Sequence, residues 1–236
     1  MVLLQDQELP PRIRRMTMSR RKKIFLALAT SVFVIMFICY FMFIRIIKVP
    51  TGSMANNVIP GDRLIVTKLF GDIKRGDVIV FQFPEDPSVQ YLSRVIGLPG
   101  ESIEIKDSRV YINNEELKEI RVFVEEDTEI LPMSEISSEG DGSYRVFYYS
   151  REEGVDDIRM EMMSQVARFG TRKPHKIAEG NYFVMGDNRD NSADSRFWGT
   201  VPENLVTGKA LRILFNQQND NTSKEFISWE RFFAIP

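Results

Sequence analysis

The five residues Pro50-Thr51-Gly52-Ser53-Met54 place a serine hydroxyl between a flexible glycine and a bulky apolar side chain. A serine can be the nucleophile of acyl transfer, but its hydroxyl is weak at neutral pH unless a neighbouring base takes the proton. Ser53 is therefore a candidate nucleophile, and the alternative is an ordinary turn serine. Whether Ser53 is a nucleophile or a turn serine depends on the elements that hold it and on the residues that accompany it.

A second stretch, residues 186–199 with the sequence GDNRDNSADSRFWG, is packed with polar groups directly after an apolar run. A solvated loop rarely ends in Phe-Trp-Gly. Buried charges need partners, so we expect a rigid hydrogen-bonded scaffold around a site. Its charged members are Arg94, Asp187, Asp194 and Arg196.

Residues 24–44 form an apolar run without a charge, which predicts a transmembrane helix. At ~1.5 Å per residue, these 21 residues match a hydrocarbon core of ~30 Å. Seven Lys and Arg residues lie between positions 12 and 23, and only Arg45 and Lys48 follow closely. The positive-inside rule then places the N-terminus in the cytoplasm and residues 50–236 outside.

A cleaved signal peptide is the alternative for the same run. Its apolar core would have ~7–15 residues and would lead to a small-residue cleavage site. This run is longer and continues into Arg45-Ile46-Ile47-Lys48, which favours a retained anchor.

The charge distribution excludes some classes of partner and site. The net charge is −2, but residues 1–49 carry nine basic and two acidic side chains, so residues 50–236 sum to −9. An acidic external part argues against a nucleic-acid partner. With one cysteine, Cys39, and one histidine, His175, neither a disulfide nor a zinc site is expected. We therefore expect no metal and no cofactor.

From residue 63 onward, short runs rich in Val, Ile, Tyr and Phe alternate with Gly, Pro, Asn and Asp, which predicts a mainly β domain. Asn113-Asn114 is expected to join two arms of a hairpin. The predicted strands cover residues 63–67, 77–83, 91–96, 102–106, 110–113, 182–185 and 209–215.

The composition divides the chain into four parts. Residues 1–23 are a basic cytoplasmic tail and residues 24–44 the span. Residues 45–115 and 179–236 form the β domain. Residues 116–178, richer in Glu, Asp and Ser, are predicted to be an inserted, smaller domain, in which 146–149 and 160–167 are further strands or a short helix.

Taken together, residues 50–54, 60–62, 94–101 and 186–199 resemble type I signal peptidase, the membrane-anchored leader peptidase of bacteria. The motifs stand in the order of that family, and residues 116–178 take the place of its variable second domain. The resemblance implies a mainly β, signal-peptidase-like sheet fold and a serine endopeptidase without a cofactor. Such an enzyme removes signal peptides from secreted preproteins at the outer face of the cytoplasmic membrane.

The resemblance also implies roles for individual residues. Ser53 is the nucleophile, and its backbone N–H and the Thr51 hydroxyl form the oxyanion hole. Ser192 orients the base. The supporting ion pairs are Asp187 with Arg94 and Asp194 with Arg196. The substrate is an extended peptide with small residues before the cut, bound against a strand edge.

Position 93 departs from the family pattern. The lysine that serves as general base in the family immediately precedes the arginine of Arg94-Val95-Ile96-Gly97, and here that residue is Ser93. Burial can lower the pKa of a lysine toward ~7–8, which suits a base, and a serine hydroxyl has no such property. We therefore expect an enzyme that is slow, or inactive in isolation.

Three other sources of a base remain open. Lys68 or Lys106 could enter the site from a neighbouring strand, or His175 could do so because its ordinary pKa suits the task. A hydroxyl network of Ser53, Ser93 and Ser192 with water, or a partner protein, is the third possibility.

Two functions are consistent with this pattern. One is a membrane-anchored signal peptidase, whose partners are signal peptides and the lipid bilayer. The other is a non-catalytic signal-peptidase paralogue that binds signal peptides or an active partner enzyme.

Overall fold

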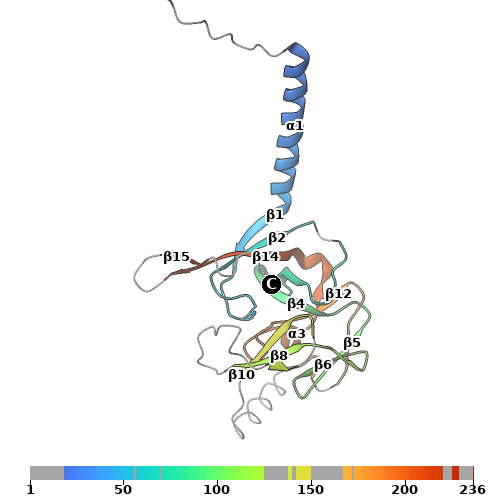
Figure 1. The fold of residues 1–236 in the computed structure, drawn as a ribbon. Coiled ribbons are helices and arrows are strands. Elements are labelled where there is room, and N and C mark those ends of the chain that lie inside the picture. Colours follow the sequence, from blue (N-terminus) through green and yellow to red (C-terminus); the bar gives the residue numbers. More distant parts are fainter. Residues whose placement is uncertain are drawn as a thin grey trace, which may run out of the picture. The chain divides into compact units, whose positions relative to one another are not determined.

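The computed structural model describes residues 19–55, 57–69, 71–124, 138–139, 142–149, 167–171, 173–219, 225–228 and 236. The chain divides into two compact units, residues 1–42 and residues 43–236. The first contains nearly all of helix α1 (Arg20–Phe43), and the second contains the strands (Figure 1).

Helix α1 covers the apolar run and ends one residue earlier than predicted, because Ile44 already belongs to strand β1 (Ile44–Lys48). Leu, Met, Ala and Phe fill the helix and it contains no proline, so nothing in its interior interrupts the backbone hydrogen bonds. In the part of the chain that the structure describes, no helix reaches the combination of length and apolar character that crossing a membrane requires.

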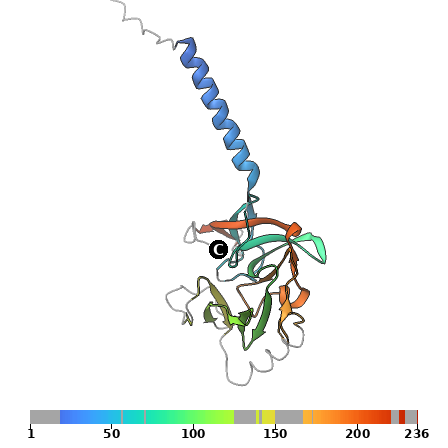
Figure 2. The ribbon, with the colours of Figure 1, turned by 90° about the vertical axis from the view of Figure 1, so that its right-hand side faces the viewer.

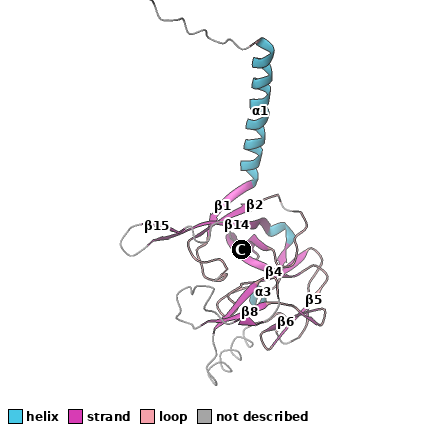
Figure 3. Ribbon diagram, viewed as in Figure 1, coloured by secondary structure: helices cyan, strands magenta, loops and turns pink. Residues whose placement is uncertain are grey.

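Residues 43–236 are built mainly of strands, as predicted (Figure 3). The main sheet has the order β1-β2-β14-β3-β4-β12-β13, with β15 paired to β14. Its other strands are β2 (Asp62–Thr67), β3 (Val78–Phe83), β4 (Asp86–Gly97), β12 (Asn181–Met185), β13 (Val201–Pro202), β14 (Val206–Asn219) and β15 (Glu225–Ser228). The pairs within this sheet and with β13 are antiparallel.

Each of the seven predicted strands is present, but two are longer than expected by more than one residue. Strands β4 and β14 extend beyond their apolar centres. In β14 the register shifts between Ala210 and Arg212 and again between Ile213 and Phe215, and such bulges let a long strand bend.

A second sheet has the order β11-β5-β6-β7. It consists of β5 (Ser102–Lys106), β6 (Arg109–Ile112), β7 (Glu115–Glu116) and β11 (His175–Lys176). The predicted hairpin joins β6 to β7 through Asn113 and Asn114, whose φ angles are 51° and 71°. Two consecutive residues at positive φ are typical of a type I′ turn, which asparagine tolerates.

A third sheet pairs β10 (Arg145–Tyr149) with β8 (Ile120–Val124) and β8 with β9 (Ser138–Glu139). Figure 2 shows these strands in a view perpendicular to that of Figure 1. The prediction for residues 146–149 is confirmed by β10, whereas residues 160–166 of the other predicted element lie outside the described part. The division into a β domain and an inserted domain stays a prediction.

Among the described residues of 43–236, buried apolar side chains form three clusters. The first lies beneath the turn that contains Ser53 and includes Met54, Leu64, Val80 and Ile213, all at most 1% exposed. The second surrounds Phe81 and Val184, and the third joins the main sheet to the second sheet through Ile103 and Phe183. Burying such a side chain fully contributes about 1.5–3 kcal/mol, so the first cluster fixes the floor of the site.

Candidate active site

The turn that carries Ser53 is held from below. Met54 is 1% exposed in the first apolar cluster, and its carbonyl accepts the N–H of Val58 at 2.8 Å. The N–H of Ala55 donates to the carbonyl of Gly52 at 3.0 Å, which closes the turn. Ser53 itself is only partly buried, so its side chain is available above a fixed base.

A groove with a volume of 560 Å³ lies beside Ser53. Three separate parts of the chain line it, namely residues 47–54, residues 80 and 89–93, and residues 191–193. The groove therefore brings together the turn of Ser53, the strand of Ser93 and the polar stretch of Ser192. These three hydroxyl residues, predicted to share one site, do line the same cavity.

The polar stretch 186–199 is held by buried ion pairs and hydrogen bonds that involve the charged residues named from the sequence. The Arg94 guanidinium donates to both oxygens of Asp187, at 2.8 and 2.6 Å, and these side chains are 4% and 1% exposed. Arg196 contacts both oxygens of Asp194, at 2.8 and 2.9 Å. Asp194 also accepts the N–H of Gly186 at 2.9 Å and caps the short helix α3 (Ser195–Trp198).

This stretch clamps the turn of Ser53 through backbone atoms. The N–H of Asn188 donates to the carbonyl of Ser53 at 3.0 Å, and the Asn188 side chain donates to the carbonyl of Gly52 at 3.3 Å. The Thr51 hydroxyl lies 3.4 Å from the Ser53 hydroxyl. The predicted oxyanion-hole residues are therefore adjacent, although their catalytic roles stay predictions.

Ser93, which the resemblance to the family places at the position of the base, is 4% exposed on β4. Lys68 is exposed just after β2, and Lys106 pairs with Glu104 at 2.8 Å in the second sheet. His175 packs against the rings of Phe169 and Phe183, and burial lowers the pKa of its imidazole. None of these three side chains lines the groove of Ser53.

Lys48 contributes the single amine among the described residues that line the groove. It lies between Ile47 and Val49, which both pack in the first apolar cluster, and it is exposed. Because side chains of a strand alternate between faces, the amine of Lys48 points away from that cluster. The hydroxyl of Thr51 is the single described hydrogen-bond partner of the Ser53 hydroxyl.

Comparison with known families decides what this arrangement belongs to. The family described as "Signal peptidase, peptidase S26" matches residues 21–215, which is most of the chain. The chain belongs to this signal peptidase family. In the described part of this family member, no group of three or more His, Cys, Asp or Glu side chains could hold a metal ion.

Individual relatives carry the same name. A signal peptidase I of Pseudomonas fluorescens is 32% identical over 194 residues, which cover 70% of this chain but 63% of that protein. A signal peptidase I of Rickettsia typhi is 33% identical over 211 residues and 76% of each chain. The crystal structure of a signal peptidase I from Enterococcus faecalis V583 shares 24% identity with a TM-score of 0.35, over 60% of this chain and 98% of that one.

Sequence reasoning missed several residues that hold this signal peptidase site together. Asn57 donates to Asp187 and to the carbonyl of Arg145, both at 2.7 Å. Arg189 is fully buried and forms an ion pair with Glu119. Asn57 lies between the motifs at residues 50–54 and 60–62, and Arg189 lies within residues 186–199. The high content of polar residues in these segments is the sequence feature that could have indicated them. Glu119 follows the acidic pair Glu115 and Glu116, and nothing in its surroundings distinguishes it.

Gly186 provides a test of how tightly the clamp fits. A Cβ atom at this position would lie 2.2 Å from the Ser192 hydroxyl oxygen and 2.5 Å from the carbonyl oxygen of Ser53. We expect Gly186→Ala to lower the free energy of unfolding by about 1–3 kcal/mol, the usual cost of overpacking. Chemical denaturation measures it. Gly52→Ala is the matched control, because nothing lies within 4 Å of its Cβ position, and equal losses in the two variants would contradict the clamp.

Proposed function

We propose that this signal peptidase family member is a membrane-anchored serine endopeptidase that removes signal peptides from secreted preproteins, with Ser53 as nucleophile. The observation that carries the proposal is the clamp of Asn188 on the Ser53 carbonyl at 3.0 Å, beside a 560 Å³ groove. An ordinary turn serine needs neither the groove nor the buried ion pairs behind the clamp.

The chemistry follows from these atoms. The Ser53 oxygen attacks the scissile carbonyl carbon while a base takes the serine proton. The base then gives this proton to the leaving nitrogen, the C–N bond breaks, and the amine of the mature protein departs as the acyl-enzyme ester forms. Water then hydrolyses the ester and restores Ser53. The Ser53 N–H and the Thr51 hydroxyl stabilise the developing oxyanion, and each such donor contributes about 2.7–4 kcal/mol.

The groove suits an extended peptide with small side chains before the cut. Among the described residues, strand β1 pairs on one side only, with β2, so the backbone groups of its other side can pair with an added strand. Met54 and Leu92 line the same groove. Bulky apolar side chains on its walls favour small side chains in the substrate next to the scissile bond.

The anchor belongs to the same proposal. Residues 24–43 of α1 carry no charge, and large apolar side chains are exposed along the helix, among them Phe25, Phe33, Met36 and Tyr40. A helix that is apolar on all sides needs an apolar environment. The basic residues 12–23 then remain in the cytoplasm and residues 50–236 lie on the outer side.

A second function, a non-catalytic paralogue that binds signal peptides or an active partner enzyme, is favoured by one observation. Ser93 stands where the base is expected, and the single amine among the described groove residues, on Lys48, is exposed. This protein would keep the groove and the clamp but would lack the group that activates Ser53.

The first function is tested by comparing the full chain with Ser53→Ala, each isolated from the membrane fraction in detergent and offered a secretory preprotein. We expect the mature product from the parent chain and a rate at least about 10²-fold lower from the variant, because the nucleophile is lost. Equal cleavage by both proteins would refute the peptidase proposal. Recovery of the chain in the soluble fraction would refute the anchor.

A further inference from the structure

Arg189 is the largest fully buried side chain among the described residues. Its side-chain partners come from the connection between β7 and β8, from strand β10 and from its own loop. It donates to both oxygens of Glu119, with 2.9 Å from Nη1 to Oε2. It also contacts the Tyr148 hydroxyl at 3.3 Å and donates from Nε to the carbonyl of Gly186 at 3.2 Å. Because these hydrogen bonds come from several directions, they fix the position of the Arg189 guanidinium.

Glu119 connects this pair to the other ion pairs of the site. The Tyr144 hydroxyl donates to Glu119 at 3.1 Å, and burial together with the Glu119 carboxylate raises the pKa of the phenol, so it stays protonated. The Tyr144 ring lies 4.6 Å below the Arg94 guanidinium, which binds Asp187. Glu119 therefore contacts Arg189 directly and is linked to Arg94 through the ring of Tyr144.

The effect of Arg189 on the Ser53 turn passes through short contacts. Gly186, whose carbonyl accepts from Arg189, lies against the Ser53 carbonyl and the Ser192 hydroxyl. The carbonyl of Arg189 accepts from Arg196 at 2.7 Å, and the N–H of Arg189 donates to the carbonyl of Phe147 at 2.9 Å. Moving Arg189 would therefore move the residues that hold Ser53 and Ser192.

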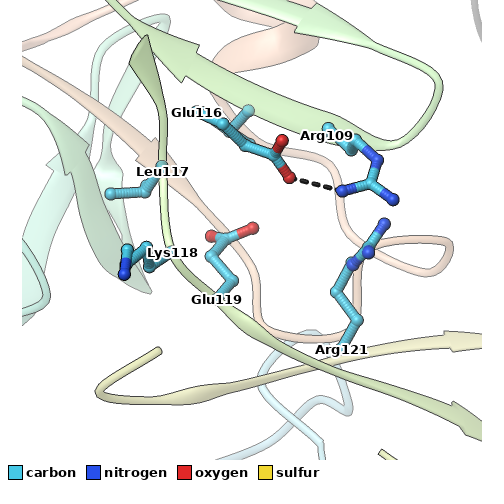
Figure 4. Close-up of a pocket in the computed structure, with 7 residues that line it drawn as sticks. Arg109, Glu116, Leu117, Lys118, Glu119 and Arg121 are labelled. Atoms are coloured by element: carbon cyan, nitrogen blue, oxygen red, sulfur yellow. Dashed lines mark hydrogen bonds and ion pairs between the residues drawn. The ribbon is translucent and has the colours of Figure 1, made fainter. Parts of the chain in front are cut away.

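Glu119 also forms part of the wall of a cavity of 330 Å³, which Figure 4 shows with Arg109 and Arg121 at the right and Leu117 and Lys118 at the left. In that view the Arg109–Glu116 pair lies across the cavity from Glu119. The Arg109–Glu116 pair is 41% and 45% exposed, whereas Arg189 and Glu119 are 0% and 3% exposed. Two acidic side chains three residues apart thus have very different environments.

We propose that Glu119 is a positioning residue for the Ser53 site and that it acts through Arg189. Buried ion pairs often add little net stability compared with apolar residues of the same volume, so stability alone gives a poor reason for this pair. The Glu119–Arg189 pair instead fixes the position of residues Gly186 to Arg189. The effect of this pair on catalysis by Ser53 rests on the proposed function, whereas its effect on the position of the loop does not.

The test measures hydrogen exchange of backbone amides in the full chain in detergent. In Glu119→Gln, a neutral side chain of the same shape, we expect the amides of Gly186, Asn188 and Arg189 to exchange about tenfold faster or more, because their loop opens more often. Amides in the β2–β14 pairing should not change. Glu116→Gln is the matched control and should leave all of these rates unchanged.

A second variant separates position from stability. Removing both partners with Glu119→Leu and Arg189→Met leaves no buried charge unpaired, so the fold is retained, yet the loop amides should still exchange faster than in the parent. Unchanged loop exchange in this double variant, or equal acceleration in β2 and β14 of Glu119→Gln, would overturn the proposal. If no variant cleaves a preprotein, the peptidase function fails while the exchange result still decides the role of Glu119.

Discussion

Replacing Ser93 with lysine is expected to raise kcat/KM for signal-peptide cleavage by about 10²–10⁴-fold, the usual contribution of a positioned general base. Ser93 is 4% exposed and lines the groove together with Ser53. Burial lowers the pKa of an introduced amine, so part of it would be unprotonated near neutral pH. Cleavage of a preprotein in detergent measures the gain.

The controls separate the amine from the added volume. Ser93→Met places a side chain of similar length without a nitrogen, and Ser53→Ala with Ser93→Lys keeps the base but removes the nucleophile. Both should cleave no faster than the parent chain. The rate of Ser93→Lys should rise with pH through the pKa of the new amine, because the base acts unprotonated. A rate equal to that of Ser93→Met would show that the missing amine does not limit this site.

The same experiment distinguishes the two functions. If the parent chain binds a signal peptide without cutting it and Ser93→Lys cuts it, the non-catalytic paralogue is supported. If the parent chain already turns over rapidly in a Ser53-dependent manner, that alternative is refuted. In that case the base is the amine of Lys48, a group outside the described groove residues, or water held among the hydroxyls of Ser53, Ser93 and Ser192.

The second large effect is expected from Asp187→Ala, which should lower the free energy of unfolding by about 3–5 kcal/mol, the cost of leaving a buried charge without its partner. Arg94 is 4% exposed on its side chain and donates two hydrogen bonds to Asp187. Asn57 would lose its 2.7 Å contact with the same carboxylate. Urea unfolding of the full chain in detergent measures the change.

Glu116→Ala is the control for this loss. It removes the partner of Arg109 in an ion pair whose side chains are both more than two-fifths exposed, and such pairs contribute about 0–1 kcal/mol. A loss in Asp187→Ala no larger than in Glu116→Ala would mean that burial of the Arg94–Asp187 pair has no energetic consequence.

The seven predicted strands could be recognised because their apolar runs are short and bounded by turn residues such as Asn113 and Asn114. Strand β1 was missed for the opposite reason. Ile44–Lys48 continues the apolar run of α1 without a glycine, proline or other turn residue between them, so composition does not show where the helix ends. The backbone pairing of β1 with β2 decides it.

Some residues of the candidate site could likewise be predicted from the sequence, and others could not. The ion pair of Asp194 and Arg196 could be expected because the two residues are close in sequence within a dense polar stretch. Glu119 could not, since 70 residues separate it from Arg189 and several acidic residues surround it in the chain. An ion pair between two loops so far apart in the chain depends on tertiary packing, which a single sequence does not display. The groove beside Ser93 could not be predicted from the sequence for the same reason, because three segments that are distant in the chain form its walls.

The contacts of Asn188 and Arg189 with their neighbours have an evolutionary consequence. Phe147 and Ser53 both bind this dipeptide through main-chain N–H and C=O groups, which every amino acid except proline possesses in full. Substitutions in β10 can therefore accumulate without removing the link to the Ser53 turn. A homologue with very different residues at 116–178 would keep these main-chain hydrogen bonds to Asn188 and Arg189, provided that neither of these two positions is occupied by proline.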